Sequence, residues 1–197
     1  MKRTSVSNIK RCRRTEYSYS DLKGKKTLIT GGPASGKLGY ARRLLEEAIE
    51  ASGGLITVID FSPSLRTPDG ADVGGRLYDG HSPMVRVLSS KLMKAPVLTA
   101  ETPEDLVRLA EYNRSITEAL LDQFNDSTDI LFINDVHLHL QRGTLQTLWD
   151  VVREVDTVVL TGRMGSERGD ELGTGVPRRE RTLMTRLGSK MDKVIQL

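Results

Sequence analysis

The stretch TLITGGPASGKLGYARRLL, residues 27–45, joins a short apolar run with β-branched residues to a segment whose apolar residues recur at helical spacing. Between them, Gly31, Gly36 and Lys37 fit the spacing G-x-x-x-x-G-K. Glycines at these points let successive backbone N–H groups turn toward one centre, the helix start adds its positive dipole end, and the lysine supplies a cation. This combination predicts a phosphate-binding loop, for which a plain strand-to-helix turn is the alternative.

The ligand expected on this loop is the triphosphate of ATP or GTP, because the motif follows a strand and opens a helix. The residues expected to bind it are Gly31, Gly32, Pro33, Ala34, Ser35, Gly36, Lys37 and Leu38. The last of these departs from the motif, which has Ser or Thr after the lysine because that hydroxyl ligates Mg²⁺. Leu38 carries no oxygen, so one expected contact to the metal is missing.

A second apolar strand, DILFIND at residues 129–135, ends in polar residues. In phosphate-loop proteins an acid after such a strand holds Mg²⁺. Here an amide, Asn134, occupies that position, and the acid Asp135 follows one residue later. An amide oxygen is a poorer magnesium ligand than a carboxylate. Asp135 is therefore the candidate metal ligand and a candidate catalytic residue, and the sequence leaves open whether magnesium accompanies the nucleotide.

Asp60 is a second candidate catalytic residue. It ends an apolar strand at residues 55–60, and ligands in open α/β sheets bind outside the carboxyl ends of the strands. There it would orient water or a metal ion. The alternative is a turn residue that only ends the strand.

The remaining apolar segments follow in the order of a parallel α/β sheet. We expect strands at residues 25–30, 55–60, 84–90, 95–100, 129–135, 157–162 and 193–197. We expect helices from residue 41, from Thr102-Pro103, over 145–155 and before the last strand. Residues 61–83, rich in Gly, Pro, Asp and Ser, predict a long loop that closes over a ligand. The predicted fold is a three-layer P-loop NTPase fold with a mainly parallel central sheet.

The order of TLITGGPASGK, TPEDL, DILFIND, VDTVVLTGR and DKVIQL resembles the recombinase-type branch of P-loop proteins, in particular the ATP:corrinoid adenosyltransferase family. The resemblance implies that residues 31–37 cradle the triphosphate and that Asn134-Asp135 stands at the family's Asp-Glu pair. It also implies that Thr161-Gly162-Arg163 faces the nucleotide edge, which makes Arg163 a further nucleotide-binding candidate. Leu38, Asn134 and the stretch 165–182 depart from the family's pattern.

The formal net charge of +3 is unevenly distributed. Residues 1–26 hold nine Lys or Arg against Glu16 and Asp21, so the rest of the chain is net acidic. We place a flexible basic arm at residues 1–22 and the nucleotide-binding domain at residues 23–197, and we expect residues 1 to about 20 to be dispensable for folding. Such an arm is a candidate contact to nucleic acid, and a solvated terminus is the alternative.

The composition, 38% hydrophobic and 28% charged, is that of a soluble globular protein. We expect no membrane partner and a cytoplasmic location, because no apolar run approaches the roughly 18 residues of a membrane span and no signal peptide is apparent. The one cysteine, Cys12, excludes an internal disulfide and a cysteine metal cage.

Two weaker candidates are a histidine pair and an arginine cluster. His137 and His139, if in a strand, would point to one side as metal ligands do, but no third ligand stands near them in the sequence. The arginine cluster consists of Arg178, Arg179 and Arg181. It is a candidate contact to a phosphate or to nucleic acid, and a run of solvated charges is the alternative.

Three functions fit the sequence. The first is a slow NTPase or an enzyme of adenosyl or nucleotidyl transfer, in which Asp135 or Asp60 takes the metal role. The second is a regulatory module that binds a nucleotide without hydrolysing it. The third is a nucleic-acid-associated ATPase that uses the basic arm and arginines near residues 178–186. The base preference, the second substrate and the oligomeric state stay open.

Overall fold

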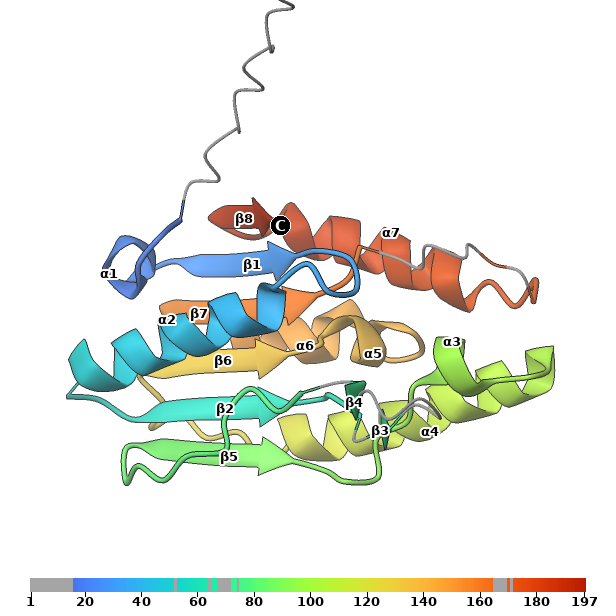
Figure 1. Ribbon diagram of the computed structural model, residues 1–197, viewed down its shortest axis with the longest axis horizontal. Helices are drawn as coiled ribbons and strands as arrows, with labels where there is room; N and C mark the ends of the chain where they lie inside the picture. The colour runs from blue at the N-terminus through green and yellow to red at the C-terminus, as the bar shows by residue number, and fades with distance from the viewer. Residues whose placement is uncertain are drawn as a thin grey trace, which may run out of the picture.

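The computed structural model describes residues 16–51, 53–63, 65–66, 72–73, 75–164, 170 and 172–197. Its centre is a six-stranded sheet in which all pairings are parallel, in the order β5-β2-β6-β7-β1-β8 (Figure 1). The strands are β1 (Lys26–Thr30), β2 (Ile56–Asp60), β5 (Val85–Ser89), β6 (Ile130–Asn134), β7 (Thr157–Gly162) and β8 (Lys193–Gln196).

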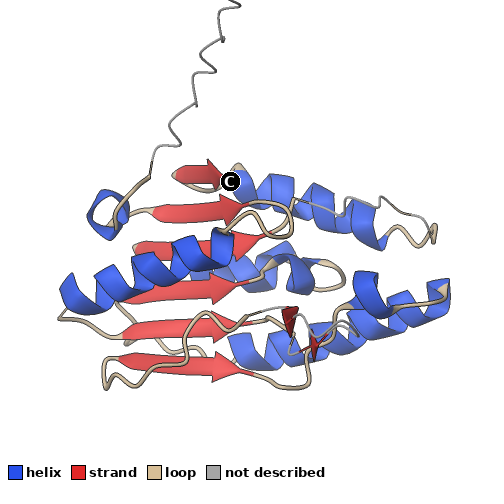
Figure 2. Ribbon diagram, viewed as in Figure 1, coloured by secondary structure: helices blue, strands red, loops and turns tan. Residues whose placement is uncertain are grey.

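Helices cover both faces of the sheet (Figure 2). One face carries α1 (Tyr19–Leu22) and α2 (Lys37–Ala51), and the other carries α4 (Pro103–Leu121), α6 (Leu145–Val152) and α7 (Val176–Gly188). Two short helices, α3 (Pro96–Thr99) and α5 (His137–Leu140), lie beyond the carboxyl ends of the strands (Figure 1). The expected three-layer α/β fold with a parallel central sheet is thereby confirmed.

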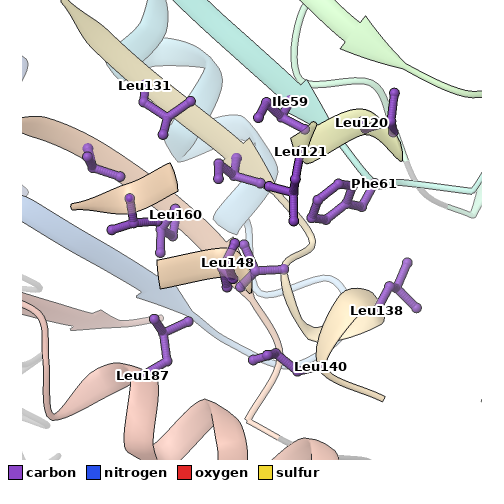
Figure 3. Close-up of a cluster of buried hydrophobic side chains, with 14 of the residues drawn as sticks. Ile59, Phe61, Leu120, Leu121, Leu131, Leu138, Leu140, Leu148, Leu160 and Leu187 are labelled. Carbon is purple, nitrogen blue, oxygen red and sulfur yellow. The ribbon is translucent and has the colours of Figure 1, made fainter. Parts of the chain in front are cut away.

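The alternating side chains of the central strands fill two separate cores. In β6, Leu131 and Ile133 belong to one buried cluster, which Figure 3 shows with residues of α4, α5, α6 and α7, whereas Ile130 and Phe132 belong to the cluster under α1 and α2. A parallel strand buried on both faces needs apolar residues at consecutive positions rather than at alternate ones. This is why the run Ile130 to Ile133 predicts a central strand so well.

The expected boundary between arm and domain, after residue 22, lies too late in the chain. Tyr19 and Leu22 are buried in the cluster under α1 and α2. The Tyr19 amide donates to Glu47 Oε2 over 2.6 Å, and the Tyr17 amide donates to the Tyr40 hydroxyl over 2.8 Å. Residues 17–22 therefore belong to the domain, and residues 1–15 of the expected arm lie outside the described residues.

Residues 95–100, expected as a strand, contain the helix α3 instead. Pro96 stands in its first turn, where the fixed backbone angle of proline suits a helix and its missing N–H costs nothing. The start of α4 is as expected, since Thr102 Oγ1 accepts from the Asp105 amide over 3.1 Å.

The segment expected as one long loop contains a two-stranded antiparallel ladder, β3 (Leu65–Arg66) with β4 (Asp72–Val73). Residues 64, 67–71 and 74 of this segment lie outside the described residues. Its expected closure over a ligand therefore stays a prediction. Within the described ranges, no helix has both the length and the apolar character that crossing a membrane requires.

Candidate functional site

A cavity of about 750 Å³ lies at the carboxyl edge of the sheet, where ligands bind in open α/β sheets. The loop after β1, the ends of β6 and β7, and the helices α3 and α5 form its walls. It brings together most of the expected site residues: Pro33, Ala34, Ser35, Gly36, Lys37, Leu38, Asn134, Asp135 and Arg163. Gly31, Gly32 and Asp60 lie outside the lining that the described residues form.

The backbone of the loop turns through two left-handed residues, Ala34 with φ +57° and Gly36 with φ +88°. The turn places the first residue of α2, Lys37, directly after the loop. A side chain at Gly31 would put its Cβ 2.2 Å from Ser35 Oγ. Glycine at position 31 is thus required by the close approach of the loop to itself, and the loop is compact.

The Lys37 ammonium donates to Gly32 O over 3.3 Å, a contact within its own loop. An anion in the cavity would take over this donor at little cost, since a single long bond to a carbonyl is weaker than a charge-assisted one.

Leu38 packs against the neighbouring segment of the chain. A Cβ on Gly75 would lie only 2.6 Å from Leu38 Cδ2, so the leucine methyl touches the backbone there. Leu38 also packs against the buried cluster under α1 and α2. Its apolar side chain thereby supports the segment at Gly75, which lines the cavity.

The Asp60 carboxylate is buried and holds the segment that follows β2. It accepts from the Ser62 amide over 2.9 Å and from the Leu77 amide over 2.6 Å. Its third donor is Asn134 Nδ2, also over 2.9 Å. With three donors on its two oxygens and only 2% of the residue exposed, Asp60 is placed to anchor backbone beside the cavity.

Asn134 continues this network toward β7. Its Oδ1 accepts from Thr161 Oγ1 over 2.6 Å, and Thr161 Oγ1 accepts from the Asp135 amide over 3.0 Å. Three neighbouring strand ends, those of β2, β6 and β7, are therefore tied together through side chains. The network fixes the backbone at Asp135.

Asp135 is the acid that faces the cavity. Its backbone is left-handed, with φ +55°, a conformation that Asp tolerates better than most residues. Only 16% of its side chain is exposed, and burial raises its pKa to about 6, against the opposing effect of the Lys37 charge. A carboxylate with a pKa in this range is suited to taking up and releasing a proton near neutral pH.

The two histidines lie on the helix α5 rather than in a strand, and they do different things. His139 is hydrogen-bonded through both ring nitrogens, with Thr117 Oγ1 at 2.8 Å and Thr144 O at 3.0 Å. His137 lines the cavity, and its Nδ1 lies 3.7 Å from Asp135 Oδ1. Burial lowers the pKa of His137 well below 6.5, so its ring is neutral at pH 7. Because both ring nitrogens of His139 are engaged, the two histidines are not placed as the metal pair that was the weaker candidate from the sequence.

Two further functional candidates were not predicted from the sequence. They are Gln141, the residue that follows α5, and Glu180 of α7. Gln141 Nε2 donates to Glu180 Oε2 over 2.7 Å, and Arg163 Nε donates to Glu180 Oε1 over 3.4 Å. Glu180 is fully buried, and burial raises its pKa. A signal for it exists: Glu180 stands four residues from Val176 and four from Met184, on the apolar face of α7.

The arginine cluster of α7 lies elsewhere. Arg178 and Arg179 are exposed, and Arg179 Nη2 donates to Gly143 O over 2.8 Å. In the described part of the chain, no group of three or more His, Cys, Asp or Glu side chains is placed to hold a metal ion.

Comparison of the chain with protein-family models finds no matching family, and comparison with curated proteins finds no match.

Proposed function

We propose that the chain binds a nucleoside triphosphate, ATP or GTP, through the backbone of residues 31–37 and the ammonium of Lys37. The observation that carries the proposal is the loop itself: two left-handed residues followed at once by the start of a 15-residue helix, at the wall of a cavity. N–H groups at such a helix start are unpaired within the helix and favour anions.

The charges of the cavity support the same ligand. Lys37 lines it as a cation at the loop, and Ser35 Oγ is buried at the loop with no hydrogen-bond partner among the described residues. A phosphate oxygen would accept from the Ser35 hydroxyl and from Lys37 together. These groups bind phosphates without any contribution from a metal ion.

Chemistry at this site is expected to be slow. Leu38 packs against the segment at Gly75, and Asn134 is engaged by Asp60 and Thr161, so neither expected magnesium contact is available in its usual form. Asp135 is the residue placed to accept a proton. We therefore favour a nucleotide-binding module with slow turnover at most, over a fast NTPase or transferase.

The experiment is titration calorimetry with ATP and GTP on the full chain and on Lys37→Ala. A charge-assisted hydrogen bond contributes roughly 1.5–3 kcal/mol, so the variant should bind about 10–100-fold more weakly. Lys23→Ala, at an exposed lysine outside the cavity, is the matched control and should bind as the wild type does. Absence of binding to the wild type, or equal affinity in Lys37→Ala, would overturn the proposal.

A turnover assay on the same samples separates the alternatives. Hydrolysis that rises with added DNA or RNA would favour the nucleic-acid-associated ATPase, and hydrolysis that rises with Mg²⁺ alone would favour the enzyme. Tight binding with hydrolysis far below the roughly 1–100 per second of kinases would favour the binding module.

A further inference from the structure

We propose that the cavity holds a second ligand beside the nucleotide: a small organic anion with an apolar body and a hydroxyl or amino group. Its site consists of Gln141, Arg163 and the apolar wall formed by α3 and Leu138. The inference rests on the proposed function, because it assigns the loop side of the same cavity to the nucleotide phosphates.

Gln141 supplies the first argument. The residue is fully buried, it lines the cavity, and its Oε1 has no hydrogen-bond partner among the described residues. Its Nε2 is held by Glu180 Oε2 at 2.7 Å, which fixes the amide so that Oε1 is left over. A buried carbonyl oxygen without a partner costs roughly 1–3 kcal/mol, so a ligand that donates to it gains that contribution.

The hydrogen-bonding character of this atom separates it from the phosphate site. A phosphate chain offers acceptors, and Gln141 Oε1 is itself an acceptor. The unpaired atom at the loop, Ser35 Oγ, can donate. The loop wall therefore suits an acceptor ligand, whereas the wall at Gln141 suits a ligand with an O–H or N–H group.

Arg163 supplies the cation that would bind the negative charge of the ligand. Its guanidinium lines the cavity with 15% of the side chain exposed, and its Nε faces the buried Glu180 over 3.4 Å. The ion pair holds the arginine in place from behind. A guanidinium fixed in this way is well suited to bind a carboxylate, because little side-chain freedom is lost on binding.

The wall beside these groups is apolar. Pro96, Val97 and Leu98 line it from α3, with Ala95 just before that helix, and Leu138 lines it from α5. Leu98 is 52% exposed. The wall is held firmly, since Asn113 of α4 accepts from the Lys94 amide over 2.9 Å and donates to Lys94 O over 3.0 Å. Phosphates gain nothing from such a surface, whereas a hydrocarbon body does.

The test uses the full chain with labelled Leu and Val methyl groups, observed by NMR. The probes are 4-hydroxyphenylacetate, 4-hydroxybenzoate and 6-hydroxyhexanoate. Phenylacetate lacks the hydroxyl, and 4-hydroxyphenylacetamide lacks the charge. At least one hydroxy acid should shift the methyl resonances of Val97, Leu98 and Leu138. Its matched analogue should bind about tenfold more weakly, which corresponds to a loss of roughly 1.4 kcal/mol of binding free energy. No shift from any hydroxy acid, or equal binding of the matched analogues, would overturn the proposal.

Two variants assign the contacts. Gln141→Met should weaken the binding of the hydroxy acid and leave the binding of phenylacetate unaffected. Gln123→Met, at an exposed glutamine of a distant segment, should change the binding of neither probe. Leu98→Ser keeps the proposal testable if Gln141→Met fails to fold, because Leu98 is exposed; it should weaken all the probes.

Calorimetry with ATP separates this inference from the proposed function. If the chain binds hydroxy acids but does not bind ATP, the second site is supported and the proposed nucleotide site is overturned. If Gln141→Met weakens the binding of ATP and not the binding of the hydroxy acids, Gln141 contacts the nucleoside, and the second site is overturned.

Discussion

The side-chain amide of Asn134 bridges two neighbouring strands: it donates to Asp60 Oδ1 over 2.9 Å and accepts from Thr161 Oγ1 over 2.6 Å. The orientation of the amide follows from its partners, because an ionised carboxylate can only accept. An acid at position 134 would face the Asp60 carboxylate in a site of which only 2% is exposed. The amide that departs from the expected metal-ligand pattern is therefore matched to Asp60.

Asn134→Asp should destabilise the protein by roughly 3–5 kcal/mol at pH 7.5, because it places an uncompensated charge in a buried site. The second carboxyl will have a folded-state pKa above its unfolded value of about 3.9, so the cost is complete above the folded pKa and shrinks as the pH falls. Urea unfolding at pH 7.5 and at pH 5 measures both. Asn125→Asp, at an exposed position, is the control and should show neither effect.

Exchanging the two groups gives a sharper comparison. Asp60→Asn combined with Asn134→Asp keeps one amide opposite one carboxylate, so it should recover part of the stability that Asn134→Asp loses. Full additivity of the two single changes would show that the 2.9 Å contact is not what selects the amide.

Asp135→Asn should stabilise the protein at pH 8. Burial raises the pKa of Asp135 from 3.8 to about 6, so the folded state holds its proton more tightly than the unfolded state does. Stability is therefore lost as the pH rises from about 4 to about 6, and roughly 3 kcal/mol is missing above that window. The amide variant carries no such cost, and Asn tolerates the left-handed backbone as Asp does.

Denaturant unfolding of wild type and Asp135→Asn at pH 8 and pH 4 checks this expectation. The difference between the two proteins should be largest at pH 8 and close to zero at pH 4. Asp126→Asn, at an exposed loop position, should give no difference at either pH. A constant difference at both pH values would mean that the charge of Asp135 is not the cause.

The fold was readable from the sequence because its strands are apolar at consecutive positions. The side chains of residues 130–133 and of residues 158–160 point alternately into the two cores, so few other structures accommodate these apolar runs. The strand expected at residues 95–100 was wrong because a short apolar run has no periodicity that separates a strand from a helical turn. Only Pro96, which suits a first helical turn, pointed to α3.

The candidate site was readable in part. The loop and Asp135 follow local patterns, and the cavity brings them together. Contacts across the sheet carry no local pattern: nothing near Asn134 in the sequence reveals Asp60 as its partner 74 residues away. Gln141 was missed for the same reason, since its pairing with Glu180 depends on how α5 and α7 pack, whereas Glu180 itself has a local signal in its place on the apolar face of α7.

Gly31→Ala should impair ligand binding at the loop. Its Cβ would lie 2.2 Å from Ser35 Oγ and 2.8 Å from Ser35 Cβ, so the loop must shift. Displacement of several loop N–H groups should lower the affinity for ATP by about tenfold or more, since each hydrogen bond to a charged group contributes roughly 1.5–3 kcal/mol. Calorimetry on this variant and on Gly53→Ala, where a Cβ meets open space, checks the expectation. Equal affinity in both variants would contradict the loop assignment.

Nucleotide affinity should change by less than about threefold when Mg²⁺ is removed with EDTA, because the proposed phosphate contacts come from backbone N–H groups, Ser35 and Lys37. The converse variant combines Leu38→Thr, Asp60→Asn and Asn134→Asp, which supplies a hydroxyl and an acid while keeping an amide beside that acid. This variant should gain a dependence on Mg²⁺ of about tenfold or more, since a divalent ion then bridges protein and phosphates. Titration calorimetry with and without EDTA on both proteins measures the two effects. A wild type that already requires Mg²⁺ would show that Asp135 provides the metal contact, and would favour an enzyme over a binding module.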